Sequence, residues 1–212
     1  MEKIGEGIIA VWKPAGMSSH DVINRVRRVS GIRTVGHAGT LDPLARGVLV
    51  IGVGRAATRS LAVEVQKEKE YVTVVRLGVT SSTDDEEGEK TAHNIAVIPS
   101  REAVEAAAQK FVGDIMQVPP IYSALKIKGK PAYAYARAGE DVAMAARPVI
   151  IKEIEVLSYE YPDIRVRAVT GAGVYIRSLA RDIGAALGTG AYMADLERTR
   201  VGEYAKGQCI VL

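Results

Sequence analysis

Asp42 is the single acidic residue between Gly36 and Ala57, in a run of glycines, small residues and valines. It precedes Pro43, which biases its backbone toward an extended conformation, and the glycines before it let a ligand approach the chain closely. A carboxylate in such a loop could act on a bound substrate. Aspartate also serves as a turn residue or as a helix N-cap, and the local sequence alone favours that structural use.

Few other side chains suggest chemistry. The three histidines are scattered, Cys209 is the only cysteine, and neither a Ser-His-Asp nor a Cys-His arrangement can be assembled. From its local sequence alone, His37 is a loop histidine bonded to backbone. The glycines of GVGRAA, residues 52–57, come in the wrong order after their strand for a nucleotide site. We therefore expect no cofactor, no metal and no internal disulfide.

The positive charge is unevenly distributed, although the formal net charge is only +3. Residues 115–138 carry four cations and no acid, and residues 165–181 carry four arginines and no acid. Binding of a polyanion requires such a local surplus, because each cation near a phosphate releases condensed counterions. Solvated faces with acids nearby in space would give the same pattern, and charge alone favours that interpretation.

Periodicity predicts helices and strands in mixed order. Amphipathic helices are predicted at 18–31, with a capping box of Ser18 and Asp21, at 100–113, with Ser100 as N-cap, and at 173–188. Strands are predicted at 47–54, 69–78, 148–160 and 163–171, the last two joined by a Pro-Asp turn. Strands that follow one another through turns, with helices between them, indicate an α+β fold around a mostly antiparallel or mixed sheet.

The bulk properties limit the class of protein. The chain has 212 residues, 48% of them hydrophobic, which suffices for a sizeable core in one large domain or two small ones. Neither a signal-peptide core at the N-terminus nor an apolar stretch of membrane-spanning length is present in the sequence. We expect a soluble, cytoplasmic protein without membrane contact, and a monomer, since no heptad pattern or exposed apolar strip is evident.

Six blocks of sequence follow one another along almost the whole chain. They are KPAGMSS (13–19), GHAGTLDPLARGVLVIGVGRAATR (36–59), KEYVTVVRLGVTSSTDDEEG (69–88), QVPPIYSALKIKGKPAYAYAR (117–137), GVYIRSLARDIG (173–184) and LERTRVG (196–202). In this order they resemble the TruB family of tRNA pseudouridine synthases. The resemblance implies the pseudouridine synthase fold, with a central sheet flanked by helices and RNA-gripping loops, in a single catalytic domain covering 1–212.

The resemblance also implies how the domain is bounded. Residues about 119–140 correspond to the family's RNA-gripping insertion. Family members often continue into a C-terminal PUA-type domain, whereas here only eight residues follow Tyr204, so we expect that domain to be absent.

By motif match, Asp42 is the catalytic carboxylate that attacks the target uridine. The family's reaction breaks the bond between N1 of uracil and the ribose, turns the base and joins C5 to the sugar, with no cofactor or metal. Arg177 is implied as the cation that pairs with Asp42, and Tyr71 as the ring that stacks on uracil and moves the C5 proton. The helical periodicity by itself places Arg177 off the apolar face, as a surface residue, and Tyr71 would be a half-buried strand residue.

The implied substrate is tRNA, whose T-loop uridine at position 55 must leave its stack to reach a buried carboxylate. His37 is implied as the wedge that fills the gap. The residues implied to bind the substrate are Lys13, His37, Tyr175, Leu196, Lys126, Lys128 and Lys130.

The implied activity is that of an isomerase, a stand-alone tRNA pseudouridine synthase. Two alternatives stay open. One is a catalytic subunit guided by a small RNA, like the dyskerin-type relatives. The other is a tRNA chaperone that remodels its substrate without chemistry.

Overall fold

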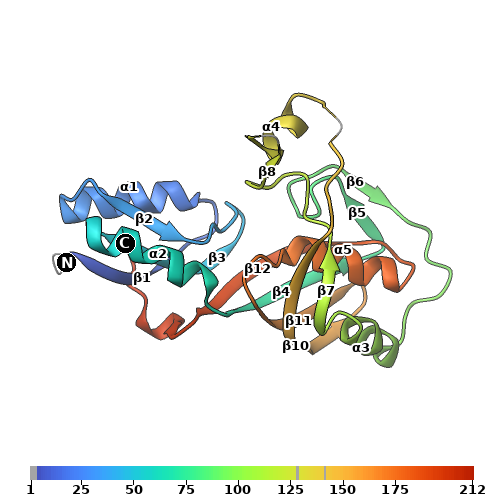
Figure 1. Ribbon diagram of the computed structural model, residues 1–212. Helices are drawn as coiled ribbons and strands as arrows, with labels where there is room; N and C mark the ends of the chain where they lie inside the picture. Colours follow the sequence, from blue (N-terminus) through green and yellow to red (C-terminus); the bar gives the residue numbers. More distant parts are fainter. Residues whose placement is uncertain (1–3, 128, 141) are drawn as a thin grey trace. The chain divides into compact units, whose positions relative to one another are not determined.

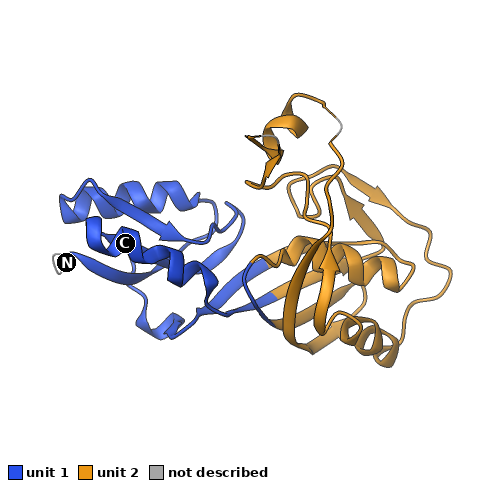
Figure 2. Cartoon of the chain, viewed as in Figure 1, with its two compact units in different colours: residues 1–72, 169–172, 196–212 blue, residues 73–168, 173–195 orange. Residues whose placement is uncertain are grey.

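The computed structural model describes residues 4–127, 129–140 and 142–212, which divide into two units. Unit 1 comprises residues 1–72, 169–172 and 196–212, and unit 2 comprises residues 73–168 and 173–195 (Figure 2). The sequence led us to expect one catalytic domain over 1–212. That the two units form one functional domain stays a prediction.

In unit 1, strand β3 (Arg46–Val53) is the centre of a sheet (Figure 1). It pairs antiparallel with β1 (Gly7–Lys13) and β2 (Val35–Ala38), and parallel with β12 (Ala191–Val201), which forms a hairpin with β13 (Tyr204–Ala205). A short 3₁₀ helix, η1 (Lys206–Gln208), follows β13.

Two helices cover opposite faces of this sheet. Helix α1 (Ser19–Ser30) packs Val22 and Val26 against Leu49 and Ile51 of β3, whereas α2 (Arg55–Gln66) packs Leu61 against the alternate residues, Val48 and Val50. Because both faces of β3 are buried, its sequence is a continuous apolar run instead of an alternating one.

The sequence predicted α1 through its caps. Ser18 accepts a hydrogen bond from the Asp21 amide at 3.1 Å, the Ser18 amide donates to the Asp21 carboxylate at 2.9 Å, and Gly31 ends the helix at a φ of 73°. Both predicted caps are confirmed. Helix α2 was not predicted, because Gly54 caps it without a side-chain hydrogen bond and its first turn has no acidic residue.

Five strands follow one another in the order β12, β4 (Lys69–Leu77), β11 (Asp163–Thr170), β10 (Arg147–Glu160) and β7 (Gly113–Gln117). Of these, β4, β11 and β12 have residues in both units, whereas β10 and β7 lie wholly in unit 2. Helices α3 (Arg101–Gln109) and α5 (Ile176–Ala186) are the two longest in this unit. Tyr71, Thr73, Val75 and Leu77 share the buried face of β4, as their alternation predicted. With its parallel and antiparallel pairs and its flanking helices, the sheet confirms the predicted α+β fold.

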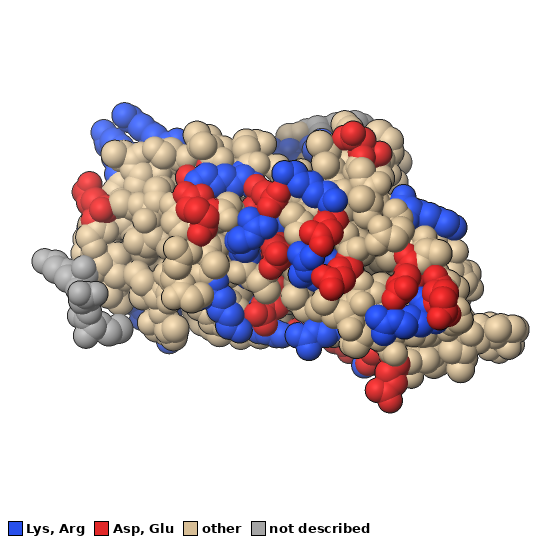
Figure 3. Space-filling view, turned by 90° about the horizontal axis from the view of Figure 1, so that it is seen from below, with Lys and Arg blue, Asp and Glu red and all other residues tan. Residues whose placement is uncertain are grey.

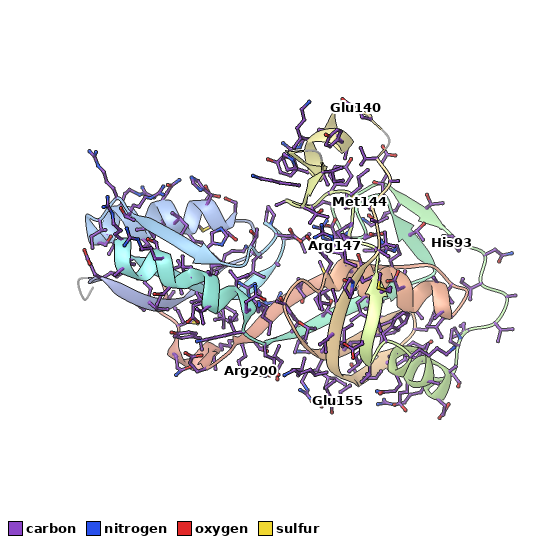
Figure 4. All side chains as sticks on the ribbon, viewed as in Figure 1. His93, Glu140, Met144, Arg147, Glu155 and Arg200 are labelled. Atoms are coloured by element: carbon purple, nitrogen blue, oxygen red, sulfur yellow. The ribbon has the colours of Figure 1, made fainter. Side chains whose placement is uncertain are left out.

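Four short strands and one short helix lie in the remaining described residues of unit 2. Strand β5 (Val79–Ser81) pairs with β6 (Lys90–Ala92), and the segment between them is the acidic loop, residues 82–89. The expected RNA-gripping insertion holds the hairpin of β8 (Lys126–Ile127) and β9 (Lys130–Pro131), followed by α4 (Ala132–Arg137). Figure 4 labels Glu140 at the end of this insertion. None of the described helices combines the length and the apolar character needed to cross a membrane.

Candidate active site

Asp42 lies in the loop that joins β2 to β3 in unit 1. The Ala45 amide donates to the Asp42 carbonyl at 3.1 Å, so Asp42 begins a turn, and the helix N-cap that its sequence also allowed is not formed. The buried Ser19 hydroxyl donates to the Leu41 carbonyl at 3.0 Å and accepts from the Leu41 amide at 2.9 Å. The Asp42 side chain, half-buried, therefore stands on a main chain that is fixed on both sides.

Lys13 is a buried cation beneath this loop. It has 0% exposure, and its ammonium donates to the carbonyls of Pro14, Met17 and Pro43 at 3.0, 2.6 and 3.2 Å. These three bonds use all the hydrogens of the ammonium, so Lys13 ties the loop to the end of β1 and has no donor left for RNA. We had expected Lys13 to bind the substrate, and its burial instead indicates a structural role.

Burial lowers the pKa of Lys13 to about 8, with Asp42 opposing the effect and Arg198 adding to it. Between about 8 and the ordinary 10.5, the unfolded chain binds more protons than the folded protein. The contribution of Lys13 to the free energy of unfolding therefore rises with pH through this window, by at most about 1.4 kcal/mol per pH unit.

Replacement of Lys13 by methionine removes this titration. We expect the free energy of unfolding of the wild type, minus that of Lys13→Met, to increase as the pH rises from about 8 to about 10. Urea unfolding at several pH values measures the difference. Lys110→Met, which changes an exposed lysine after α3, is the control for the loss of a lysine charge. A constant difference for Lys13→Met would contradict the prediction.

His37, in β2, carries an imidazole whose Nδ1 is buried and has no hydrogen-bond partner among the described residues. Burial lowers the pKa of His37, and the nearby Arg198 and His20 lower it further. The ring is therefore neutral near pH 7, which suits contact with a base better than an ion pair with a phosphate. Its role as a wedge stays a prediction.

Tyr71 and Leu196 also belong to unit 1, on β4 and β12. Tyr71 is 7% exposed and Leu196 is 5% exposed. Tyr71 is therefore buried, whereas its strand pattern alone predicted a half-buried residue. Their roles against the uracil stay predictions.

Arg177 lies on α5 in unit 2 and is only 6% exposed. Its guanidinium donates to the carbonyls of Thr83 at 3.3 Å and Tyr122 at 2.9 Å, and it forms an ion pair with Asp85 at 3.4 Å. The surface position that the helical periodicity favoured is wrong, because two loops cover this side of the helix. The pairing of Arg177 with Asp42 stays a prediction.

The acidic loop supplies the partner of Arg177. Asp85 is 3% exposed and accepts hydrogen bonds from the Thr83 hydroxyl and the Glu87 amide. The ammonium of Lys90 closes the loop by donating to the carbonyls of Asp85, Glu86 and Gly88 at 3.2, 2.7 and 2.9 Å. Asp85 lies within one of the family blocks, residues 69–88, but the sequence alone gives it no role as the partner of Arg177, because nothing local distinguishes it from its four acidic neighbours.

Asp84 and Tyr175 hold neighbouring parts of the same region. Asp84 adopts a φ of 60° and pairs with Arg181 at 2.7 Å, and burial raises the pKa of its carboxyl against the opposing effect of Arg181. Tyr175 precedes α5, where its amide donates to the Gln117 side chain at 2.8 Å and its carbonyl accepts from it at 3.2 Å. These bonds fix the start of the helix that carries Arg177.

The lysines expected to grip RNA lie on the β8–β9 hairpin. Lys126 and Lys130 are exposed, and Lys128 falls outside the described residues. The hairpin is tied to α4, because the Tyr135 hydroxyl donates to the Ile127 carbonyl at 3.1 Å and the Lys130 ammonium lies 5.8 Å from the ring of Tyr135.

The other cation-rich window, 165–181, is partly neutralised by neighbouring acids. Arg167 pairs with Glu153 and with Glu155, the latter at 2.9 Å. Figure 4 labels Glu155 at the lower edge of unit 2, and Figure 3, viewed from below, shows positive and negative side chains interspersed. For Arg167, the correct interpretation of the local charge is therefore a solvated face with acidic residues nearby.

The candidate residues are divided between the two units. Unit 1 holds Lys13, His37, Asp42, Tyr71 and Leu196, and unit 2 holds Lys126, Lys130, Tyr175 and Arg177. Among the described residues, no cluster of three or more histidine, cysteine or acidic side chains could hold a metal ion.

Two family models match the chain. Residues 27–176 match the N-terminal domain of TruB family pseudouridylate synthases, and residues 177–212 match the tRNA pseudouridylate synthase B C-terminal domain.

Among curated relatives, tRNA pseudouridine synthase B of Thermobifida fusca is 46% identical over 99% of this chain and 74% of its own length. The protein of that name from Leifsonia xyli subsp. xyli is 49% identical over 96% of this chain and 70% of its own length.

Solved structures are also similar. A chain in the crystal structure of a Cbf5–Nop10–Gar1 complex is 32% identical, with a TM-score of 0.75 over 97% of this chain and 52% of that one. A chain of an H/ACA RNP bound to a substrate RNA containing 2′-deoxyuridine is 29% identical, with a TM-score of 0.71 over 97% of this chain and 50% of that one. The chain spans about half the length of these solved chains.

Proposed function

The chain belongs to the TruB family of pseudouridylate synthases, and from this premise we propose that it converts uridine 55 in the T-loop of tRNA to pseudouridine. As a member of this family it is an isomerase. The position of Asp42 carries the proposal: the family's aspartate stands half-buried on a turn whose main chain is fixed by Ser19 and Lys13. The names of the relatives, tRNA pseudouridine synthase B, support tRNA as the substrate.

In the proposed reaction, Asp42 acts on the flipped uridine while the N1 bond to the ribose breaks. The base turns in the site, C5 bonds to the sugar carbon that N1 has left, the C5 proton departs and N1 gains a proton. The product is an isomer, so no co-reactant is consumed. Tyr71 is the proposed carrier of the C5 proton. Arg177, oriented by Asp85, is the proposed cation that keeps the carboxylate charged in an enclosed site.

Tritium release tests the proposed function. The purified chain is incubated with a T-arm hairpin labelled with tritium at C5 of its uridines, and we expect release equal to the label of the target uridine. A hairpin with cytidine at the target position is the matched control and should release none. Binding without release would favour the chaperone. Release only after addition of a guide RNA would favour the dyskerin-type subunit. The similarity to a chain of an H/ACA RNP is the reason to include this arm of the experiment.

We also propose that the β8–β9 hairpin contacts tRNA phosphates. The double variant Lys126→Gln/Lys130→Gln is expected to weaken tRNA binding and to reduce the slope of log K against log salt by about 1.5, because two phosphate contacts are lost. Adding Lys128→Gln should lower the slope further. Filter binding over a range of salt concentrations measures the slope, with Lys110→Gln as the control. An unchanged slope would count against the hairpin as a phosphate contact.

A further inference from the structure

Arg198, on β12 in unit 1, is among the largest fully buried side chains and is only 1% exposed. Its Nε donates to the Val48 carbonyl at 2.8 Å, and one terminal nitrogen donates to the Gly39 carbonyl at 3.1 Å. Gly39 precedes Asp42 in the loop, and Val48 follows it at the start of β3. One guanidinium therefore bridges the two ends of the segment that carries Asp42.

Two glycines lie close to Arg198. Arg198 pairs with Gly47 in the parallel ladder, and a Cβ at Gly47 would lie 2.2 Å from the Arg198 carbonyl oxygen. Gly39 has a φ of +85°, and a Cβ there would lie 3.6 Å from the guanidinium and 3.9 Å from the Lys69 side chain. Gly47 is therefore required by the close approach of the Arg198 main chain, whereas at Gly39 the positive φ favours glycine and the contact with the guanidinium is an ordinary one.

The guanidinium is part of a buried group of cations. Lys69 is 6% exposed and donates to the carbonyls of Val65 and Lys67, both at 2.6 Å. Arg198 contributes to lowering the pKa values of Lys13, Lys69 and His37, so all three lie within its electrostatic reach. Burying like charges together costs folding free energy, and an apolar side chain of similar volume is often at least as stable. Stability alone therefore does not account for a cation at this position.

We propose that Arg198 is a positioning residue for Asp42: by bonding to the Gly39 and Val48 carbonyls it holds the loop that carries Asp42. This inference rests on the proposed function, because it assumes that Asp42 is the reacting group. Arg198 itself contacts main chain and is assigned no contact with the substrate.

The test compares Arg198→Met and Arg198→Lys with Arg200→Met. Arg200 lies two residues along the same strand and binds Glu68 at 2.6 Å and the Gly202 carbonyl, away from the loop (Figure 4). For Arg198→Met we expect a fall of about 100-fold in the single-turnover rate, with RNA affinity nearly unchanged. Arg198→Lys should regain part of the rate, because an ammonium can reach one of the two carbonyls. Arg200→Met should keep the wild-type rate.

Hydrogen exchange separates positioning from general destabilisation. In Arg198→Met, faster amide exchange should be confined to peptides within residues 36–48, whereas Arg200→Met should leave them unchanged. A wild-type rate in Arg198→Met, or a rate loss matched by faster exchange throughout unit 1, would overturn the proposal. If Arg198→Met does not fold, the single-turnover rate and the hydrogen exchange of Arg198→Lys test the proposal instead.

The outcome can be separated from a failure of the proposed function. If the wild type releases no tritium from the T-arm hairpin, the proposed function has failed. Exchange in residues 36–48 still reports whether Arg198 holds the loop, so a normal exchange pattern in Arg198→Met would overturn the inference independently.

Discussion

Asp42→Asn is expected to lower tritium release from the T-arm hairpin by at least about 1,000-fold. Asparagine matches aspartate in shape and is favoured at the first position of a turn, so the hydrogen bond from Ala45 and the loop should persist. The neutral amide is neither the nucleophile nor the base that the reaction requires. Single-turnover release measures the effect, and binding to the same hairpin should remain measurable.

The control for this variant is Asp114→Asn. Asp114 is an exposed aspartate on β7 in unit 2, and its replacement should leave the release rate unchanged. A folded Asp42→Asn protein that releases tritium at the wild-type rate would show that another group performs the chemistry. Loss of both release and binding would instead point to damage of the loop, which hydrogen exchange in residues 36–48 would reveal.

Arg177→Met is expected to lower the free energy of unfolding by about 3–5 kcal/mol, because it leaves the buried Asp85 carboxylate without its ion-pair partner. Activity should fall by at least about 100-fold even at temperatures where the variant is folded, because a cation is lost from the proposed site. Urea unfolding and single-turnover tritium release measure the two effects.

A double variant separates these effects. In Arg177→Met/Asp85→Asn the uncompensated charge is gone, so much of the stability should return while the activity stays low. Arg165→Met, which removes an exposed arginine of β11, is the control and should change neither quantity. Recovery of activity together with stability would show that Arg177 serves the fold alone.

The parts of the fold that could be predicted are those with local signals. The capping box of Ser18 and Asp21 and the glycine at 31 mark both ends of α1, and the alternation from Tyr71 to Leu77 marks one face of β4. Helix α2 was not predicted, because its start has neither a capping side chain nor an acidic residue in its first turn.

For the candidate site, the family motifs predict Asp42, Tyr71 and Arg177, and these roles stay predictions. The groups that contact Arg177 and the Asp42 loop come from elsewhere in the chain. Asp85 meets Arg177 across more than 90 residues of sequence, and Arg198 meets Val48 across 150. Such partners are brought together by tertiary structure, and no periodicity or spacing in the sequence indicates them.

Unit 1 combines segments that are far apart in the sequence, residues 1–72, 169–172 and 196–212. During synthesis the first segment leaves the ribosome long before Arg198 is made. The Asp42 loop is therefore translated well before the arginine that is proposed to hold it. Contacts of such large sequence separation close slowly. A nascent chain halted before β12 would therefore carry every residue of the GHAGTLDP motif without the arginine that holds it. The proposed hold on the loop therefore forms only after β12 has been synthesised.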